Sequence, residues 1–279
     1  MECHLKDIAI HYELFGEGLP ILMLHGWSLS HRHMLATMEP HFTGRKGWMR
    51  IYTDLPGHGR TPGKTWITDQ DKMLEVLLAF IDQIIPGQRF VVAGASAGAY
   101  MARGVAYRKT AFLDGLLLTV PLIVAPDAKR NVPAHASIVK DPALMAGLGP
   151  AEAETMRDLA VVQSQEIVDA LRMFALPTEE AGDPGFQSNI RNDPTKYAFT
   201  FDVDSLSEPI AAPTLIVAGR QDSNVGYRQA WDILENYPRA TFAVLDRAGH
   251  LLEIEQPEIL HALVKEWLDR VEEYAATRK

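Results

Sequence analysis

Cysteine is almost absent from this sequence, and basic clusters and long apolar runs are absent altogether. The single cysteine among 279 residues, Cys3, excludes an internal disulfide framework and favours a reducing, cytoplasmic location. The chain carries 27 basic against 36 acidic residues, so nucleic acid is not an expected partner. No apolar run approaches the roughly 20 residues of a membrane-spanning helix, and the N-terminus lacks the basic start and apolar core of a signal peptide. We therefore expect no membrane partner.

Short apolar segments alternate with longer amphipathic segments along most of the chain. The alternating residues 8–14 predict a half-exposed antiparallel strand, and the uniformly apolar residues 20–24 predict a strand that is buried on both faces. One helix is expected to start at Thr68 and to end before Pro86, and another to start near Pro257. Further strands are expected at 50–54, 90–93, 116–120, 214–218 and 241–245. This alternation predicts an α/β fold, with a mostly parallel sheet between two layers of helices.

One long interval, residues 121–208, contains no candidate for a buried strand. Prolines recur through it, and residues 151–174 favour a single long helix. We expect a core domain from residues 1–120 and 209–279, with residues 121–208 inserted as a helical cap. Because α/β sheets bind ligands at the carboxyl ends of their strands, the cap is expected to cover the site. The alternative is a surface decoration with no role in the site.

The most informative motif is Gly94-Ala95-Ser96-Ala97-Gly98, directly behind the apolar strand at 90–93. Glycines on both sides allow a tight turn from strand to helix, because a Cβ atom at either position would clash there. Such a turn presents the serine hydroxyl at the end of the sheet, beside the N-terminal amides of the next helix. Ser96 is therefore the candidate nucleophile.

A serine nucleophile needs a base and a carboxylate that orients the base. Asp222 follows the strand at 214–218, and His250 follows the strand at 241–245. Asp222 alone would more readily be interpreted as the cap of a helix near Asn224, and His250 alone as a solvated loop residue. Their order along the chain, serine then acid then histidine, favours a catalytic triad.

Further motifs stand at the ends of the predicted strands: His25-Gly26-Trp27, Asp54-Leu55-Pro56-Gly57-His58-Gly59, Gly219-Arg220-Gln221-Asp222 and Gly249-His250. With these motifs, nearly the whole chain resembles a serine-dependent α/β-hydrolase of the capped, esterase-like kind. The resemblance implies an oxyanion hole built from the backbone N–H groups of Trp27 and Ala97. One departure is Ala99, at a position where many relatives have a second glycine.

The resemblance implies hydrolysis of a carboxylic ester, or a related acyl bond, of a small and largely apolar substrate through an acyl-enzyme. No cofactor is expected, and the protein is expected to be a monomer or a homodimer. Candidates for the substrate pocket are His25, Met145, Leu171, Met173, Phe174 and Phe199. The alternating aromatics Tyr197, Phe199 and Phe201 would either line the pocket or only fix the cap to the core.

Several alternatives remain beside the ester hydrolase. Carbon–carbon bond hydrolases and perhydrolases use the same triad, and some relatives of this fold are small-molecule receptors with little turnover. Haloalkane dehalogenases and epoxide hydrolases are disfavoured, because they carry aspartate where this chain has Ser96. An aminopeptidase would need acidic residues in the cap, for which Glu179-Glu180 is the candidate, although surface solvation explains that pair better. His31, His33 and His58 lack the ligand spacing of a metal site, so no metal is expected.

Overall fold

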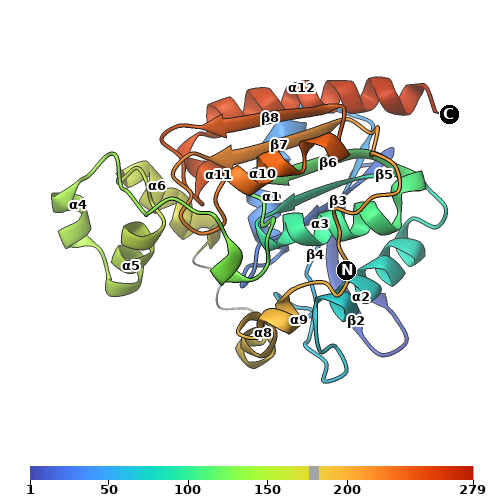
Figure 1. Cartoon of the computed structure of the whole chain (residues 1–279), viewed down its shortest axis with the longest axis horizontal. Coiled ribbons are helices and arrows are strands. Elements are labelled where there is room, and N and C mark those ends of the chain that lie inside the picture. The colour runs from blue at the N-terminus through green and yellow to red at the C-terminus, as the bar shows by residue number, and fades with distance from the viewer. Residues whose placement is uncertain (176–181, 279) are drawn as a thin grey trace.

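The computed structural model describes residues 1–175 and 182–278. Its centre is an eight-stranded sheet with the order β1-β2-β4-β3-β5-β6-β7-β8 (Figure 1). β1 and β2 are antiparallel to their neighbours, and the other strands pair in parallel. The strands are β1 (Glu2–His4), β2 (Ala9–Phe15), β3 (Leu19–Leu24), β4 (Trp48–Thr53), β5 (Phe90–Ala95), β6 (Leu113–Thr119), β7 (Thr214–Gly219) and β8 (Ala240–Leu245). The predicted mostly parallel sheet is confirmed, and β1 is a strand that the sequence did not suggest.

Two helical layers cover the sheet because the side chains of each central strand alternate between its faces. Leu22 and Leu24 of β3 belong to one core cluster, which also holds the apolar faces of α2 and α3. Ile21 and Met23 belong to the opposite cluster, with the apolar faces of α1 and α12. The helices around the sheet are α1 (His31–Met38), α2 (Gln70–Ile84), α3 (Ala97–Arg108), α10 (Arg228–Asp232), α11 (Leu252–Glu255) and α12 (Pro257–Ala276).

The cap of α2 lies one residue later than predicted. The cap is Asp69, not Thr68: the Asp69 backbone is extended and its carboxylate accepts a hydrogen bond from the Lys72 backbone N–H. The Thr68 hydroxyl donates to that same carboxylate. An ionised aspartate is a stronger acceptor than a threonine hydroxyl, and this explains which residue caps the helix.

Short helices fill the connection between β6 and β7. They are α4 (Pro142–Gly147), α5 (Pro150–Asp158), α6 (Gln165–Ala170), the π-helical turn η4 (Leu171–Ala175), α8 (Pro184–Arg191) and α9 (Pro194–Tyr197). The long helix expected over 151–174 is therefore wrong. α5 ends at Asp158, and Ser164 starts α6 by accepting a hydrogen bond from the backbone N–H of Ile167.

The group α4 to α6 lies beyond the carboxyl end of β8 (Figure 1). It has a small apolar core that includes Met156, Ile167 and Leu171 and contacts Leu251 and Ile254 near α11. Within the part of the chain that the structure describes, no helix is both long and apolar enough to cross a membrane.

Candidate active site

The turn between β5 and α3 holds Ser96 in a backbone conformation that side chains rarely adopt, with φ at 54°. A Cβ atom at Gly94 would collide with the carbonyl of Gly98, and one at Gly98 would collide with the carbonyl of Leu24. The Ser96 backbone is also fixed to β6 by a 3.0 Å hydrogen bond from its N–H to the carbonyl of Thr119. The glycines therefore permit a strained turn that the neighbouring strands hold in place.

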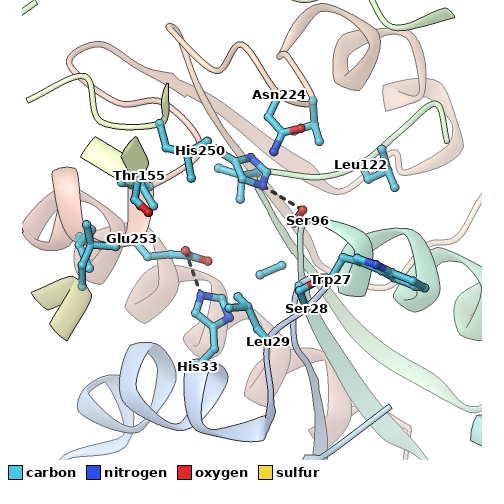
Figure 2. A pocket seen from close by; sticks show the side chains of 18 of the residues that line it. Trp27, Ser28, Leu29, His33, Ser96, Leu122, Thr155, Asn224, His250 and Glu253 are labelled. Carbon is cyan, nitrogen blue, oxygen red and sulfur yellow. Dashed lines mark hydrogen bonds and ion pairs between the residues drawn. The ribbon is translucent and has the colours of Figure 1, made fainter. Parts of the chain in front are cut away.

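Ser96, His250 and Asp222 are in direct contact although 126 and 28 residues separate them along the chain (222 − 96 and 250 − 222). His250 Nε2 lies 3.0 Å from Ser96 Oγ (Figure 2). On the other side of the ring, His250 Nδ1 lies 2.9 Å from Asp222 Oδ2. Asp222 also accepts hydrogen bonds from the backbone N–H groups of Asn224 and Val225 at 2.8 and 3.0 Å. The two interpretations of Asp222 are thus compatible: one oxygen fixes the loop and the other faces the imidazole.

Asp222 and His250 each stabilise the charged form of the other. Burial raises the pKa of Asp222, but the charge and hydrogen bond of His250, together with the N–H groups of Val225 and Asn224, outweigh burial and leave that pKa below its ordinary value. Burial lowers the pKa of His250, but the carboxylate of Asp222 raises it more, so the pKa of His250 lies above its ordinary value. The carboxylate of Glu253 adds a smaller effect in the same direction.

The loop after β3 passes close to the serine: a Cβ atom built on Gly26 would lie 3.5 Å from Ser96 Cβ. Trp27, the next residue, lines the cavity in front of Ser96. On the other side Ala97 is the first residue of α3, where a backbone N–H has no acceptor within the helix. These are the two residues whose N–H groups were expected to form an oxyanion hole.

A cavity of about 310 Å³ opens in front of Ser96 and His250. Its apolar lining includes Leu29, Leu122, Leu171, Tyr197 and Ile254. Polar side chains that were not predicted to be in the pocket line it too: His33, Arg130, Thr155, Arg191, Asn224 and Glu253. The cavity is therefore more polar than the sequence suggested.

Glu253 and His33 form a buried polar pair on one wall of the cavity (Figure 2). Their side chains are 8% and 6% exposed, and His33 Nε2 lies 3.4 Å from Glu253 Oε2. The Thr119 hydroxyl donates to the other oxygen of Glu253 at 3.0 Å. Burial raises the pKa of Glu253, but His33 and Thr119 outweigh it, so the pKa is lowered overall. The feature of the sequence that could have indicated Glu253 is its position three residues after His250, at the start of α11.

Only some of the residues that were predicted to line the pocket do so. Leu171 lines the cavity, whereas His25, Met145 and Phe199 are not among its lining residues. His25 is fully buried and joins two loops: its Nε2 accepts from the backbone N–H of Leu55, and its Nδ1 lies 2.7 Å from the Gly26 carbonyl oxygen. Met145 packs against the small core around Met156.

Phe199 fixes its segment to the core, which was the second of the two roles considered for these aromatics. Its ring stacks on Tyr100 at 4.4 Å between centroids, and its backbone N–H donates to the Tyr100 hydroxyl. Met173 was expected to face the serine, but its side chain is 81% exposed. The side chain of Phe174 and the pair Glu179-Glu180 lie outside the described residues.

Sequence relatives cover nearly the whole chain. It is 22% identical over 267 residues to a pimeloyl-acyl-carrier-protein methyl ester esterase of Legionella pneumophila (strain Corby), covering 93% of this chain and 99% of the relative. It is 21% identical over 280 residues to a 2-hydroxy-6-oxononadienedioate/2-hydroxy-6-oxononatrienedioate hydrolase of Pseudomonas putida, covering 94% and 92%.

Among solved structures, an alpha/beta superfamily hydrolase from Oenococcus oeni PSU-1 superposes with a TM-score of 0.86 at 27% identity, covering 98% of this chain and 99% of that one. The family model described as "Alpha/beta hydrolase family" matches residues 21–263, a span that contains Ser96, Asp222 and His250. The chain therefore belongs to the alpha/beta hydrolase family.

Proposed function

We propose that this enzyme hydrolyses a carboxylic ester of a small acyl substrate, with Ser96 as nucleophile, His250 as general base and Asp222 as its orienting partner. The observation that carries the proposal is the continuous hydrogen-bonded series from Ser96 Oγ through His250 to the buried Asp222, at the floor of a cavity. The named esterases among the relatives support an ester as the substrate.

In the first half of the reaction Ser96 Oγ attacks the ester carbonyl carbon and its proton passes to His250 Nε2. The oxygen that becomes negative is stabilised by the N–H groups of Trp27 and Ala97, an effect of about 3–4 kcal/mol per donor in comparable enzymes. Collapse breaks the bond to the alcohol, which leaves with the proton from His250. Water then attacks the acyl-enzyme in the same way, and this step releases the acid and restores Ser96.

A substrate panel tests the assignment. We expect steady turnover of short p-nitrophenyl esters, with a burst where deacylation limits the rate. Hydrolysis of a carbon–carbon bond is the second candidate, favoured by the dienedioate hydrolase relatives. Turnover confined to such a carbon–carbon substrate would replace the ester assignment. Labelling by a fluorophosphonate without turnover of any panel member would favour a receptor.

The pH dependence of kcat/KM should report the raised pKa of His250 and the effect of Glu253 on it. Because His250 must be neutral to accept the proton and its pKa is raised, kcat/KM should increase with pH through a midpoint above the usual value of about 6.5. Glu253→Gln removes a charge that favours the imidazolium, so the midpoint should move down. Glu258→Gln, on the exposed start of α12, is the matched control and should leave the midpoint in place. An unchanged midpoint in Glu253→Gln would show that Glu253 does not act on the base.

We also propose that residues 121–208 form a cap that sets the choice of acyl group. Leu171 carries this argument, because it joins the small core around Met156 and also lines the cavity in front of Ser96. Leu171→Ala should enlarge the pocket and raise the ratio of kcat/KM for octanoate over butanoate esters, by about 10-fold.

Phe199→Ala is the control for Leu171→Ala, because Phe199 is buried in the same segment but does not line the cavity. It should lower Tm, as loss of a buried phenylalanine costs about 3–5 kcal/mol, and leave the ester preference unchanged. Equal preferences in both variants and the wild type would assign specificity to the core domain instead.

A further inference from the structure

A second group of ligand-type side chains lies outside the cavity. His11 and Glu13 are two residues apart on β2, so their side chains share one face of the strand, and His31 is the first residue of α1. One ring nitrogen from each histidine and one carboxylate oxygen of Glu13 all lie within 4.8 Å of one another. None of the three residues lines the cavity in front of Ser96.

His31 is held between two carboxylates. Its Nδ1 lies 2.9 Å from Oδ1 of the fully buried Asp54, and its Nε2 lies 3.3 Å from Oε1 of Glu13. Both oxygens of Asp54 already accept backbone N–H groups, Oδ1 from His31 at 2.7 Å and Oδ2 from Arg60 at 2.9 Å, so this carboxylate acts as an acceptor toward the His31 ring. Nδ1 therefore carries the proton of the ring, and in the neutral imidazole Nε2 turns a lone pair toward the carboxylate of Glu13. Two such acceptors can approach each other only with a proton or a metal cation between them.

His11 adds a second ring to the same place. It is 6% exposed, its ring centroid lies 4.9 Å from that of His31, and its Nε2 has no hydrogen-bond partner among the described residues. A buried, unpartnered imidazole nitrogen is unfavourable unless something else satisfies it.

We propose that His11, Glu13 and His31 bind a Zn²⁺ ion, with Asp54 orienting His31. Two ligands at about 2.0–2.1 Å from zinc with a tetrahedral angle between them are about 3.3 Å apart, which is the separation of His31 Nε2 and Glu13 Oε1. A carboxylate behind a metal-bound imidazole fixes the tautomer and raises ligand affinity, and Asp54 is placed to do both. The side chain of Glu13 is 35% exposed, which leaves room for water as the fourth ligand.

The ion would join three parts of the fold. His11 also donates its backbone N–H to the Thr61 hydroxyl and accepts from the backbone N–H of Asp54, so β2 is already attached to the turn after β4. His31 attaches α1 to the same turn through Asp54, and a metal would link α1 directly to β2. The role of the ion would be structural, because none of its three ligands lines the cavity in front of Ser96.

Calorimetric titration of chelator-treated full-length protein with Zn²⁺ tests the proposal. The wild type should bind one equivalent, and Glu13→Gln, which keeps the shape of the side chain, should bind at least 10-fold more weakly. Zn²⁺ at a hundredfold excess over Kd should raise Tm of the wild type by about 5 °C and have little effect on the variant. Co²⁺ should give the visible absorption of a tetrahedral site in the wild type and not in Glu13→Gln.

His261→Gln is the matched control, because His261 and His41 form another close imidazole pair, 2.9 Å apart between their Nδ1 atoms. Its Zn²⁺ affinity should equal that of the wild type. The proposal is overturned if the wild type binds no Zn²⁺, if Glu13→Gln binds as tightly as the wild type, or if His261→Gln loses the binding. If the wild type binds no Zn²⁺, His31 is instead an imidazolium that bridges Asp54 and Glu13. Chelator treatment should leave ester turnover by the wild type unchanged, and a loss restored by Zn²⁺ would contradict the structural role.

Discussion

Replacing Ser96 with alanine is expected to lower kcat by roughly five to six orders of magnitude. In the proposed mechanism the hydroxyl forms the bond to the acyl group, and triad members act as a unit, so only binding and the proposed oxyanion hole would remain to assist water. Alanine and serine are equally strained at the φ of 54° that this turn requires, so the fold should be retained. Steady-state kinetics on the best ester of the panel, beside Tm and circular dichroism, gives the measurement.

Ser205→Ala, at an exposed position outside the cavity lining, is the control for Ser96→Ala and should keep wild-type kinetics. A kcat for Ser96→Ala within 10-fold of the wild type would show that another group is the nucleophile.

Asp222→Asn is expected to cost about 10⁴-fold in kcat without unfolding the protein. The asparagine carbonyl oxygen would still accept hydrogen bonds from the backbone N–H groups of Asn224 and Val225. The amide nitrogen would then take the place of the oxygen that faces His250 Nδ1. An amide nitrogen only donates, so the imidazole would have to place its proton on Nε2. In that tautomer Nε2 cannot accept the proton of Ser96.

Asp246→Asn is the matched control for this substitution. Asp246 stands four residues before His250 in the same loop, but it is exposed and its carboxylate accepts from the side chain of Gln221. Its substitution should leave kcat within a few-fold of the wild type. If Asp222→Asn kept near-normal kcat/KM and Asp246→Asn did not, the orienting role would pass to Asp246.

The sheet and the contact among Ser96, Asp222 and His250 could be predicted because short segments encode them. Residues 90–93 are uniformly apolar and the glycines at 94 and 98 admit the turn, so the place of Ser96 follows from about ten adjacent residues. Parallel strands bring their carboxyl ends to one edge of the sheet, and this brings Asp222 and His250 toward that serine.

The cavity lining could not be predicted because it depends on packing between distant segments. Phe199 is as apolar as Leu171, yet it stacks on Tyr100 of α3 while Leu171 reaches the cavity. His25 stands two residues before Trp27 in sequence, but its two hydrogen bonds hold it in the core. His33 was considered together with His31 as a metal ligand and set aside, whereas α1 directs His33 to Glu253 and His31 to Glu13.

The most direct test of the account is the site of covalent labelling by a fluorophosphonate, determined by intact mass and peptide mapping. The wild type should gain one adduct, on the peptide that contains Ser96, and Ser96→Ala should gain none. An adduct on a different residue, or equal labelling of the wild type and Ser96→Ala, would contradict the assignment of Ser96 as the nucleophile.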